Sequence, residues 1–244
     1  MNILIVGGAG KTAKPIIDVL NRENHNITVF DICSGNERYK YICGDIADIE
    51  ALSRAMKNID AVIHLAVNIS DTANDEFTFK TNVFGAYNVL HSAVENKISK
   101  ILIASSAPVH VTDEININSD YICSAGEDFA YDLTKSLQEV MARHFSRTYS
   151  LNCLIMRLGH IVDGENQISL SGEPLSDLSY CRGGWVCKYD VAEAFAKAVK
   201  TDFKGYSLIN IIGSYQAEGK FNLSAAKELI GFECRQKFFG YEIK

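Results

Sequence analysis

The chain has 244 residues and a mass of 27.0 kDa, with 47% hydrophobic and 22% charged residues. This balance is typical of a globular protein and excludes a mainly disordered chain, and the length fits one α/β domain with a small annex. The net charge of -6 and the lack of a Lys/Arg run predict that the protein binds neither nucleic acid nor an anionic membrane.

Apolar segments and cysteines indicate the compartment. No apolar run approaches the roughly 20 residues that span a bilayer, and the first residues lack the basic and apolar regions of a signal peptide. The seven cysteines show no C-x-x-C spacing. We therefore expect a cytoplasmic protein with reduced, structural thiols and no metal site.

Short β-branched runs alternate with amphipathic stretches through the first two thirds of the chain. We expect strands at residues 2–6, 27–30, 39–43, 61–65, 100–104 and 152–157. We expect helices at residues 11–21, 48–56, 75–96 and 129–149. Repeated βα units predict right-handed crossovers and an α/β fold with a Rossmann-type, doubly wound parallel sheet.

The pattern changes after Arg157. Residues 159–184 are rich in Gly and Ser, which is typical of a loop. A strand at 185–186, a helix at 190–200 with Asp190 as its N-cap, a strand at 206–212 and a helix at 224–230 follow. We expect a Rossmann domain over residues 1–158. A short lobe over 159–244 is interleaved with the last strands and helices of the sheet.

The first predicted strand leads into a glycine-rich turn, Gly7-Gly8-Ala9-Gly10-Lys11-Thr12-Ala13. Such a turn needs a glycine at positive φ, another where the backbone approaches a pyrophosphate, and a small residue where helix meets strand. Gly7, Gly10 and Ala13 supply these, and Lys11 and Thr12 open the helix whose N–H groups would hold the phosphates. A phosphate-loop NTPase is disfavoured, because position 5 is Ile where that motif needs Gly.

An acidic residue, Asp31, follows the second predicted strand, about twenty residues after the turn. A carboxylate there accepts both hydroxyls of an adenine ribose and repels a 2′-phosphate. It favours NAD over NADP, whereas Lys11 and Arg38 are basic residues that would favour NADP. The domain over 1–158 is therefore expected to bind a nicotinamide dinucleotide, NAD in preference to NADP.

Tyr131 and Lys135 lie four residues apart on a predicted helix and share one face. A phenol has a pKa of about 10, and a nearby ammonium lowers it by about 1–3 units towards a useful base. The pair opens the helix before the sixth strand, near the carboxyl ends of the strands. The fifth strand ends at Ser105-Ser106, where a hydroxyl could hold a substrate oxygen towards Tyr131. Together they predict proton transfer coupled to hydride transfer.

These residues resemble the extended short-chain dehydrogenase/reductase family, in particular its NAD-dependent epimerase/dehydratase branch. The resemblance covers nearly the whole chain. Its motifs occur in the family's order as Gly7, Gly10 and Ala13; Asp31; Gly44-Asp45-Ile46-Ala47-Asp48; His64-Leu65-Ala66; Asn82-Val83-Phe84-Gly85-Ala86-Tyr87-Asn88; Ser105-Ser106-Ala107-Pro108-Val109-His110; Tyr131 and Lys135; Arg157-Leu158-Gly159-His160; and Trp185-Val186-Cys187-Lys188-Tyr189-Asp190-Val191-Ala192.

The resemblance implies roles for single residues. Tyr131 is the general acid/base, Lys135 tunes it and holds the nicotinamide ribose, and Ser106 orients the substrate oxygen. His64 lies along the cofactor strand in a structural role, and Asn82 shapes the helix behind the site. The residues implied to bind the cofactor are Gly7, Gly10, Lys11, Thr12, Asp31, Asp45, Ile46, Leu65, Ala66, Asn82, Tyr131 and Lys135.

Departures from the family pattern bear on the substrate. Ala107-Pro108 follow the catalytic serine, where dehydratases have an Asp-Glu pair and uronate dehydrogenases usually have Asn-His. Elimination of water is therefore disfavoured. His110 and His160 replace the usual Tyr and Asn, and the segment 160–184 is short for a nucleotide-sugar lobe.

The resulting hypothesis is an NAD(P)-dependent oxidoreductase or epimerase that acts on a sugar or nucleotide-sugar. One alternative is a dehydrogenase of a small free sugar acid (uronate-like) or alcohol, which the short lobe favours. Another is a non-catalytic NAD(P)-binding sensor. Family members commonly dimerise through two long helices, so the resemblance also implies a homodimer through residues 75–96 and 129–149.

Overall fold

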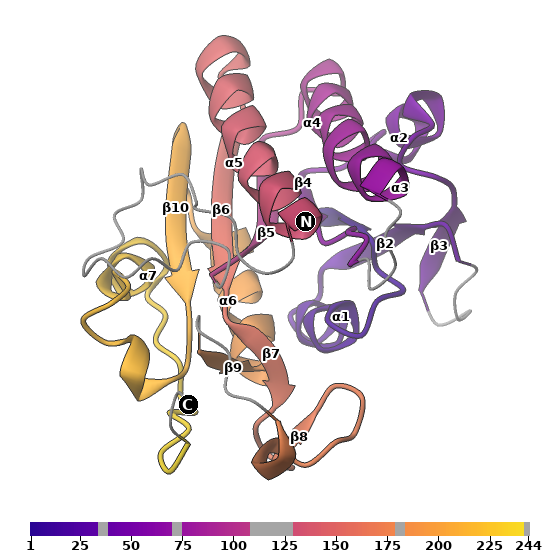
Figure 1. Ribbon diagram of the computed structural model, residues 1–244. Helices are drawn as coiled ribbons and strands as arrows, with labels where there is room; N and C mark the ends of the chain where they lie inside the picture. Colours follow the sequence, from indigo (N-terminus) through magenta and orange to yellow (C-terminus); the bar gives the residue numbers. More distant parts are fainter. Residues whose placement is uncertain (34–38, 70–74, 108–128, 179–183, 242–244) are drawn as a thin grey trace.

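The computed structural model describes residues 1–33, 39–69, 75–107, 129–178 and 184–241. Within them, seven parallel strands form one sheet in the order β10-β6-β5-β4-β1-β2-β3 (Figure 1). The strands are β1 (Asn2–Val6), β2 (Asn26–Asp31), β3 (Lys40–Cys43), β4 (Ala61–His64), β5 (Lys100–Ser106), β6 (Asn152–Leu158) and β10 (Tyr206–Ile211). The order reverses between β1 and β4, where ligands bind in such sheets. The predicted Rossmann-type sheet is confirmed.

Helices cover both faces of this sheet. On one face lie α1 (Ala13–Arg22), α6 (Lys188–Lys200) and α7 (Ser224–Ile230), and on the other lie α2 (Ile49–Ala55), α4 (Ala86–Glu95) and α5 (Phe129–Tyr149). Because side chains alternate along a strand, Ile3 and Ile5 of β1 pack with α1, and Leu4 and Val6 pack on the opposite face. The core therefore consists of two layers, one on each face.

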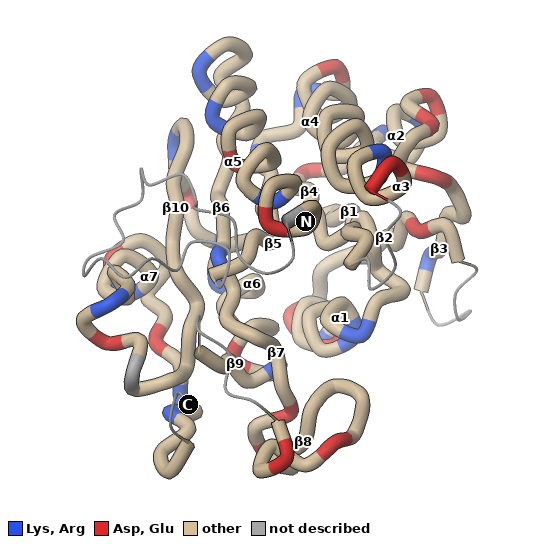
Figure 2. The backbone as a smooth tube through the Cα atoms, viewed as in Figure 1, with Lys and Arg blue, Asp and Glu red and all other residues tan. Residues whose placement is uncertain are grey.

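Charged residues are distributed over both helical layers. Figure 2 shows basic and acidic residues interspersed along the backbone, with both signs on α1. No helix in the described ranges combines the length and the hydropathy that a bilayer span requires.

The predicted helix over residues 75–96 consists of two α-helical segments separated by a π-helical one. α3 (Asp75–Phe79) leads into the π-helical η1 (Lys80–Gly85), which continues as α4. Gly85 lies so close to Ile46 that an added Cβ would stand 2.3 Å from its Cδ1 atom. The widened turn brings Asn82 into the protein interior, fully buried. π-helical turns often occur at functional sites.

The loop prediction for residues 159–184 was wrong. The segment contains β7 (His160–Asp163), β8 (Ile168–Ser169) and the short 3-10 helix η3 (Leu175–Asp177). β7 pairs antiparallel with β8 and parallel with β9 (Trp185–Cys187). Each strand is too short for a periodic pattern, and the sheet packs instead around the buried Trp185 and Phe238 from outside the segment.

The N-cap prediction for Asp190 was also wrong. α6 begins two residues earlier, at Lys188, with Cys187 as its N-cap. The buried Asp190 carboxylate instead accepts the backbone N–H groups of Arg235 and Gln236, at 3.1–3.2 Å. It therefore ties the C-terminal segment to α6.

β10 and α6 follow residue 158, yet they belong to the large sheet and to the helical layer that covers it. The division of the chain into two domains at residue 158 stays a prediction.

Candidate active site

The glycine turn joins β1 to α1 at the point where the strand order reverses. Gly7 has φ +85°, and an added Cβ would lie 2.3 Å from the backbone N of Ala66, so only glycine fits there. The N–H groups of Leu65 and Ala66 donate to Val6 O at 2.8 and 3.0 Å. The turn is thus packed directly against the segment that follows β4.

The N-terminus of α1 has the features of an anion site. Gly10 is exposed, and the nearest atom to an added Cβ would be Gly7 O at 3.5 Å, which leaves the backbone accessible. The first turn of α1 carries no acidic residue, and the N-cap Thr12 makes no side-chain capping bond. The Lys11 side chain is exposed beside it. A helix N-terminus of this kind fits the pyrophosphate of a dinucleotide.

Asp31 connects the end of β2 to the glycine turn. Its Oδ2 accepts the Ala9 N–H at 2.9 Å, and its Oδ1 accepts the Cys33 N–H at 3.1 Å. A carboxylate has about four acceptor sites, so hydroxyl groups of a ribose can still bond to it. The structure therefore places an acid beside the proposed phosphate site. Arg38 lies outside the described residues.

Asp45 and Ile46, two of the residues implied to bind the cofactor, differ in exposure. Asp45 is exposed, and its Oδ1 accepts the N–H of Ala47 at 2.8 Å. Ile46 is 4% exposed and packs against Gly85, while the Asn88 amide donates to Ile46 O at 3.0 Å. The Ile46 side chain packs in the interior, and the exposed Asp45 carboxylate offers a polar group to a ligand.

Asn82 connects the cofactor side of the site to α5. Its Oδ1 accepts the Asn68 N–H at 2.7 Å, and its Nδ2 donates to Asn68 O and to Thr134 Oγ1, both at 3.0 Å. Gln138 of α5 donates to Asn82 O at 2.7 Å. These bonds hold the segment after β4, the π-helical turn and α5 in one network.

The three residues assigned to catalysis lie at the carboxyl ends of β5 and β6. Tyr131 is half-buried on the first turn of α5, and Lys135 is buried one turn later with its Nζ 6.0 Å from the Tyr131 ring centroid. Lys135 Nζ donates to Ala104 O at 2.9 Å and to Gln138 Oε1 at 3.2 Å. Ser106 is the last residue of β5 and is buried. The geometry brings a phenol, an ammonium and a hydroxyl to one edge of the sheet.

Burial controls the protonation of two groups in this region. It lowers the pKa of Lys135 to about 8, against the opposing charge of Glu139. Burial also lowers the pKa of His64 to about 3, and the Lys135 ammonium acts in the same direction. The His64 ring nitrogens have no hydrogen-bond partner among the described residues. His64 is therefore a neutral imidazole inside the protein at neutral pH.

A buried ion pair beside the site was not predicted from the sequence. Arg157 donates to Glu139 through Nε at 3.0 Å and through NH2 at 2.7 Å, and Ser105 Oγ donates to Glu139 at 2.6 Å. The spacing of Glu139 four residues after Lys135 was the available signal, because it places both on one helix face.

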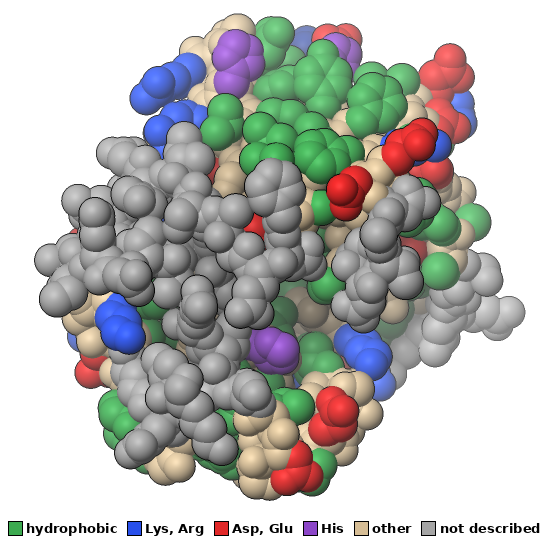
Figure 3. Space-filling view, in the orientation of Figure 1, with side chains coloured by type: hydrophobic (Ala, Val, Ile, Leu, Met, Phe, Trp, Pro, Cys, Tyr) green, Lys and Arg blue, Asp and Glu red, His purple; other side chains and the backbone are tan. Residues whose placement is uncertain are grey.

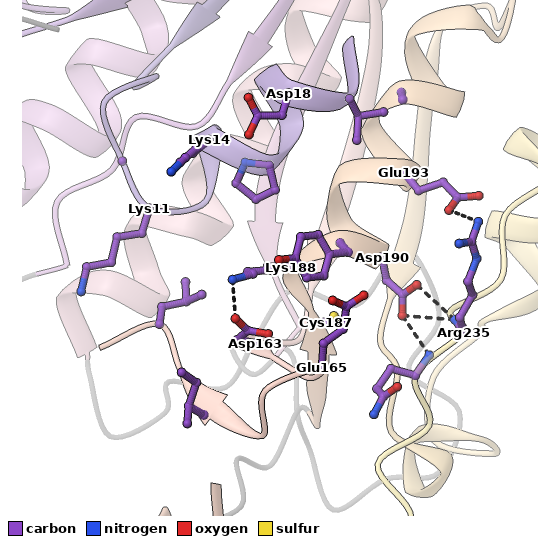
Figure 4. Close-up of a pocket in the computed structure, with 18 of the residues that line it drawn as sticks. Lys11, Lys14, Asp18, Asp163, Glu165, Cys187, Lys188, Asp190, Glu193 and Arg235 are labelled. Carbon is purple, nitrogen blue, oxygen red and sulfur yellow. Dashed lines mark hydrogen bonds and ion pairs between the residues drawn. The ribbon is translucent and has the colours of Figure 1, made fainter. Parts of the chain in front are cut away.

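A separate groove of about 1430 Å³ lies between α1, α6 and the segment around β8 (Figure 4). It reaches the glycine turn at Lys11, but neither Tyr131, Lys135 nor Ser106 lines it. Figure 4 shows Lys188 pointing to Asp163 and Arg235 to Glu193, which form ion pairs. The residues assigned to catalysis lie outside this groove, so the strand ends remain the candidate active site.

The part of the chain that the structure describes contains no group of three or more His, Cys, Asp or Glu able to hold a metal ion.

Comparisons with known proteins identify the family and agree with the fold. A family model described as "NAD dependent epimerase/dehydratase family" matches residues 3–169. An L-arabinose 1-dehydrogenase (NAD(P)(+)) of Haloferax volcanii is 23% identical over 96% of this chain and 96% of that enzyme. A uronate dehydrogenase of Pseudomonas syringae pv. tomato is 25% identical over 64% of this chain and 58% of that enzyme. The solved structure of MoeE5 in complex with UDP-glucuronic acid and NAD has a TM-score of 0.80 at 18% identity, over 97% of this chain and 94% of that chain.

Proposed function

The chain belongs to the NAD-dependent epimerase/dehydratase family, and on this premise we propose that Tyr131, Lys135 and Ser106 catalyse hydride transfer at a carbinol or ketone carbon of a sugar or sugar derivative. Membership makes it an NAD-dependent enzyme, in agreement with the predicted class and cofactor. The observation that carries the residue assignment is the buried Lys135 ammonium, one helical turn from a half-buried phenol at the strand ends.

In the proposed reaction, Tyr131 takes the proton of the substrate hydroxyl as hydride leaves the same carbon. The Lys135 ammonium stabilises the phenolate, because opposite charges at this separation favour the charged form of an acid. Ser106 donates a hydrogen bond to the substrate oxygen and orients it towards Tyr131. NAD, when bound, supplies the hydride acceptor.

The cofactor assignments rest on the turn and the strand that follows it. Gly7 allows the tight turn against Ala66, and Gly10 leaves the backbone accessible. Lys11 and Thr12 lie at the helix N-terminus, and the Asp31 carboxylate would accept the ribose hydroxyls. The remaining proposed contacts come from Asp45, Ile46, Leu65, Ala66, Asn82, Tyr131 and Lys135. Titration of NAD and NADP should show tighter binding of NAD, and tighter binding of NADP would contradict the role of Asp31.

Two substrate classes follow from different observations. The family and the similarity to a structure with UDP-glucuronic acid and NAD support a nucleotide-sugar. The L-arabinose dehydrogenase, matched over 96% of both chains, supports a free sugar, as does the short lobe after β6. A uronate-like sugar acid is the second candidate, because a uronate dehydrogenase also matches.

One assay distinguishes these candidates. The protein is mixed with NAD and, separately, with L-arabinose, a hexuronate, UDP-glucose and UDP-glucuronic acid. A dehydrogenase accumulates NADH, whereas an epimerase returns its hydride and gives a new sugar isomer without net NADH. Product analysis by NMR detects the second case. Tight NAD binding with no product from any sugar would reject the catalytic proposal and favour a non-catalytic sensor.

We also propose a homodimer through residues 75–96 and 129–149. Figure 3 shows hydrophobic side chains gathered on the surface over α4 and α5. Phe84, Tyr87 and Val140 of these segments are 51%, 42% and 44% exposed. An exposed apolar patch on two adjacent helices fits a two-fold interface. Sedimentation should give a dimer at micromolar concentration and a monomer for Val140→Glu; a wild-type monomer contradicts the proposal.

The proposed compartment is the cytoplasm. It rests on the cysteines within the described ranges, which are all free thiols even where Cys33 and Cys43 are exposed. Exposed free thiols are typical of a reducing compartment.

A further inference from the structure

Glu139 is a buried carboxylate at the centre of three elements. It lies on α5, one turn after Lys135, and is 6% exposed. Its Oε1 accepts Ser105 Oγ–H from β5 at 2.6 Å and Arg157 Nε–H from β6 at 3.0 Å. Its Oε2 accepts Arg157 NH2 at 2.7 Å. A single carboxylate therefore joins one helix to two neighbouring strands.

The bonds occur at the strand ends where the candidate site lies. Ser105 and Arg157 are opposite each other in the β5–β6 register, and Ser106 is the next residue of β5. Lys135, in turn, donates to Ala104 O on the same strand. A two-pronged Arg–carboxylate contact fixes orientation as well as distance. The position of α5 along β5 is therefore set by Lys135 at Ala104 and by Glu139 at Ser105, the two residues that precede Ser106.

Resting on the function proposed above, we propose that Glu139 is a positioning residue: bound to Ser105 and Arg157, it holds α5 on the ends of β5 and β6 and keeps Lys135 protonated beside Tyr131. It does not touch the reacting atoms. It acts through Lys135 and through the strand that carries Ser106.

The charges around Lys135 support this role. The titratable groups that face it are Tyr131 and Glu139 from α5 and His64 from β4, and Arg157 of β6 is bonded to Glu139. Among these, Glu139 raises the pKa of Lys135 against the effect of burial. Without its negative charge, the effect of burial on the Lys135 ammonium would no longer be opposed, and Arg157 would remain a second buried cation. The Lys135 ammonium would then lose its proton at lower pH.

The first experiment compares Glu139→Gln with wild type by the pH dependence of kcat. We expect the activity loss at alkaline pH to begin about one pH unit lower in the variant, with the Kd for NAD unchanged. Ser105→Ala is the matched control, because it removes one hydrogen bond of Glu139 and no charge. The kcat of Ser105→Ala should fall by a smaller factor than that of Glu139→Gln. The pH at which its activity begins to fall on the alkaline side should equal that of wild type. An unshifted pH of this fall in Glu139→Gln would overturn the proposal.

A second measurement separates this inference from the proposed function. Stability against urea is followed from pH 7 to 11, where Lys135 titrates differently in the folded and unfolded chain. The rise of stability with pH should begin about one unit lower in Glu139→Gln, and Lys135→Met should lack it. If wild type turns over no sugar yet these curves differ as expected, the proposed function fails and the charge role of Glu139 stands. Identical curves would overturn that role.

A further variant covers the case in which Glu139→Gln does not fold. Glu139→Leu with Arg157→Met replaces the ion pair by apolar side chains of similar size, a change that buried pairs often tolerate. We expect this double variant to fold and bind NAD, with kcat reduced at least about tenfold. Wild-type kcat in the folded double variant would contradict the positioning role.

Discussion

The two faces of the large sheet are built from different kinds of side chain. Under α1 and α6 the core is almost entirely apolar, with Ile16, Leu20 and Phe195 fully buried. Under α5, near the strand ends, the buried side chains include Lys135 and Glu139. The other buried polar residues on η1 and α5 include Asn82, Thr134, Ser136 and Gln138.

This difference separates the architecture from the chemistry. Apolar burial stabilises the fold by about 25 cal/mol per Å² and needs no specific partner. A buried ammonium costs free energy, and lowering the pKa of Lys135 from 10.5 to about 8 corresponds to about 3 kcal/mol at neutral pH. A protein retains such a group where its charge is used, and here it lies beside a phenol. The polar face is therefore the face to test for catalysis.

The largest expected effect is on turnover, from Lys135→Met. Loss of the ammonium should lower kcat by about 10²–10⁴-fold, because the Tyr131 phenolate loses its stabilising charge. The fold should persist, since the change removes a buried charge that opposes folding. Circular dichroism and steady-state kinetics on the same preparation check both points. If Lys135→Met is unfolded, its loss of activity follows from the loss of the fold, and this would contradict the separate roles of the two faces of the sheet.

On the apolar face, Leu20→Ala should have the converse effect. Leu20 is fully buried in the α1–α6 layer, so its truncation leaves a cavity and should reduce the free energy of unfolding by about 2–5 kcal/mol. The kcat per folded molecule should match wild type. Urea denaturation and active-site titration measure the two quantities. A large fall in kcat at full folding would show that this face also serves catalysis.

His64 predicts a smaller, pH-dependent effect on stability. Its folded pKa of about 3 lies below the unfolded value of 6.5, so the unfolded chain takes up the proton first as the pH falls. Stability from this residue is fully present above pH 6.5 and is reduced by about 2 kcal/mol at pH 5. His64→Leu should lose less stability between pH 7.5 and pH 5 than wild type does. Parallel losses in both proteins would show that His64 is protonated in the folded state.

The smallest expected effect is at the surface. Lys200 of α6 forms an ion pair with Glu23 at 2.7 Å, and its side chain is 52% exposed. Exposed pairs contribute less than about 1 kcal/mol and are screened by salt. Lys200→Ala should therefore change the melting temperature little, and less still in high salt. A loss of stability comparable to that of Leu20→Ala would contradict the small contribution expected of an exposed ion pair.

The same contrast explains how much the sequence predicts. Runs such as Ile3-Leu4-Ile5-Val6 reveal a buried parallel strand, because both faces of the strand are covered. The spacing of Tyr131 and Lys135 is equally local, since one helix carries both. The βα repetition predicts a parallel sheet with right-handed crossovers, whereas the order of the seven strands comes from the structure.

The remaining features depend on contacts between distant segments. Asp190 read as an N-cap because it preceded an apolar helix face, but its carboxylate is used by the backbone of Arg235 and Gln236. The pairing of β7 with β9 joins strands too short for a periodic signal. Glu139 reads as a surface acid until β5 and β6 are placed beneath α5. Such contacts join segments far apart in the sequence, and the spacing of Lys135 and Glu139 indicates only that they share one helix face.

The most direct test of the account is kcat for Tyr131→Phe, measured beside its Kd for NAD. The variant lacks only the phenolic oxygen, so the packing of α5 and the glycine turn should be preserved. We predict a kcat about 10²–10⁴-fold below wild type on whichever sugar the wild-type protein converts, with NAD bound equally well. Wild-type turnover in Tyr131→Phe would contradict the assignment of proton transfer to this residue.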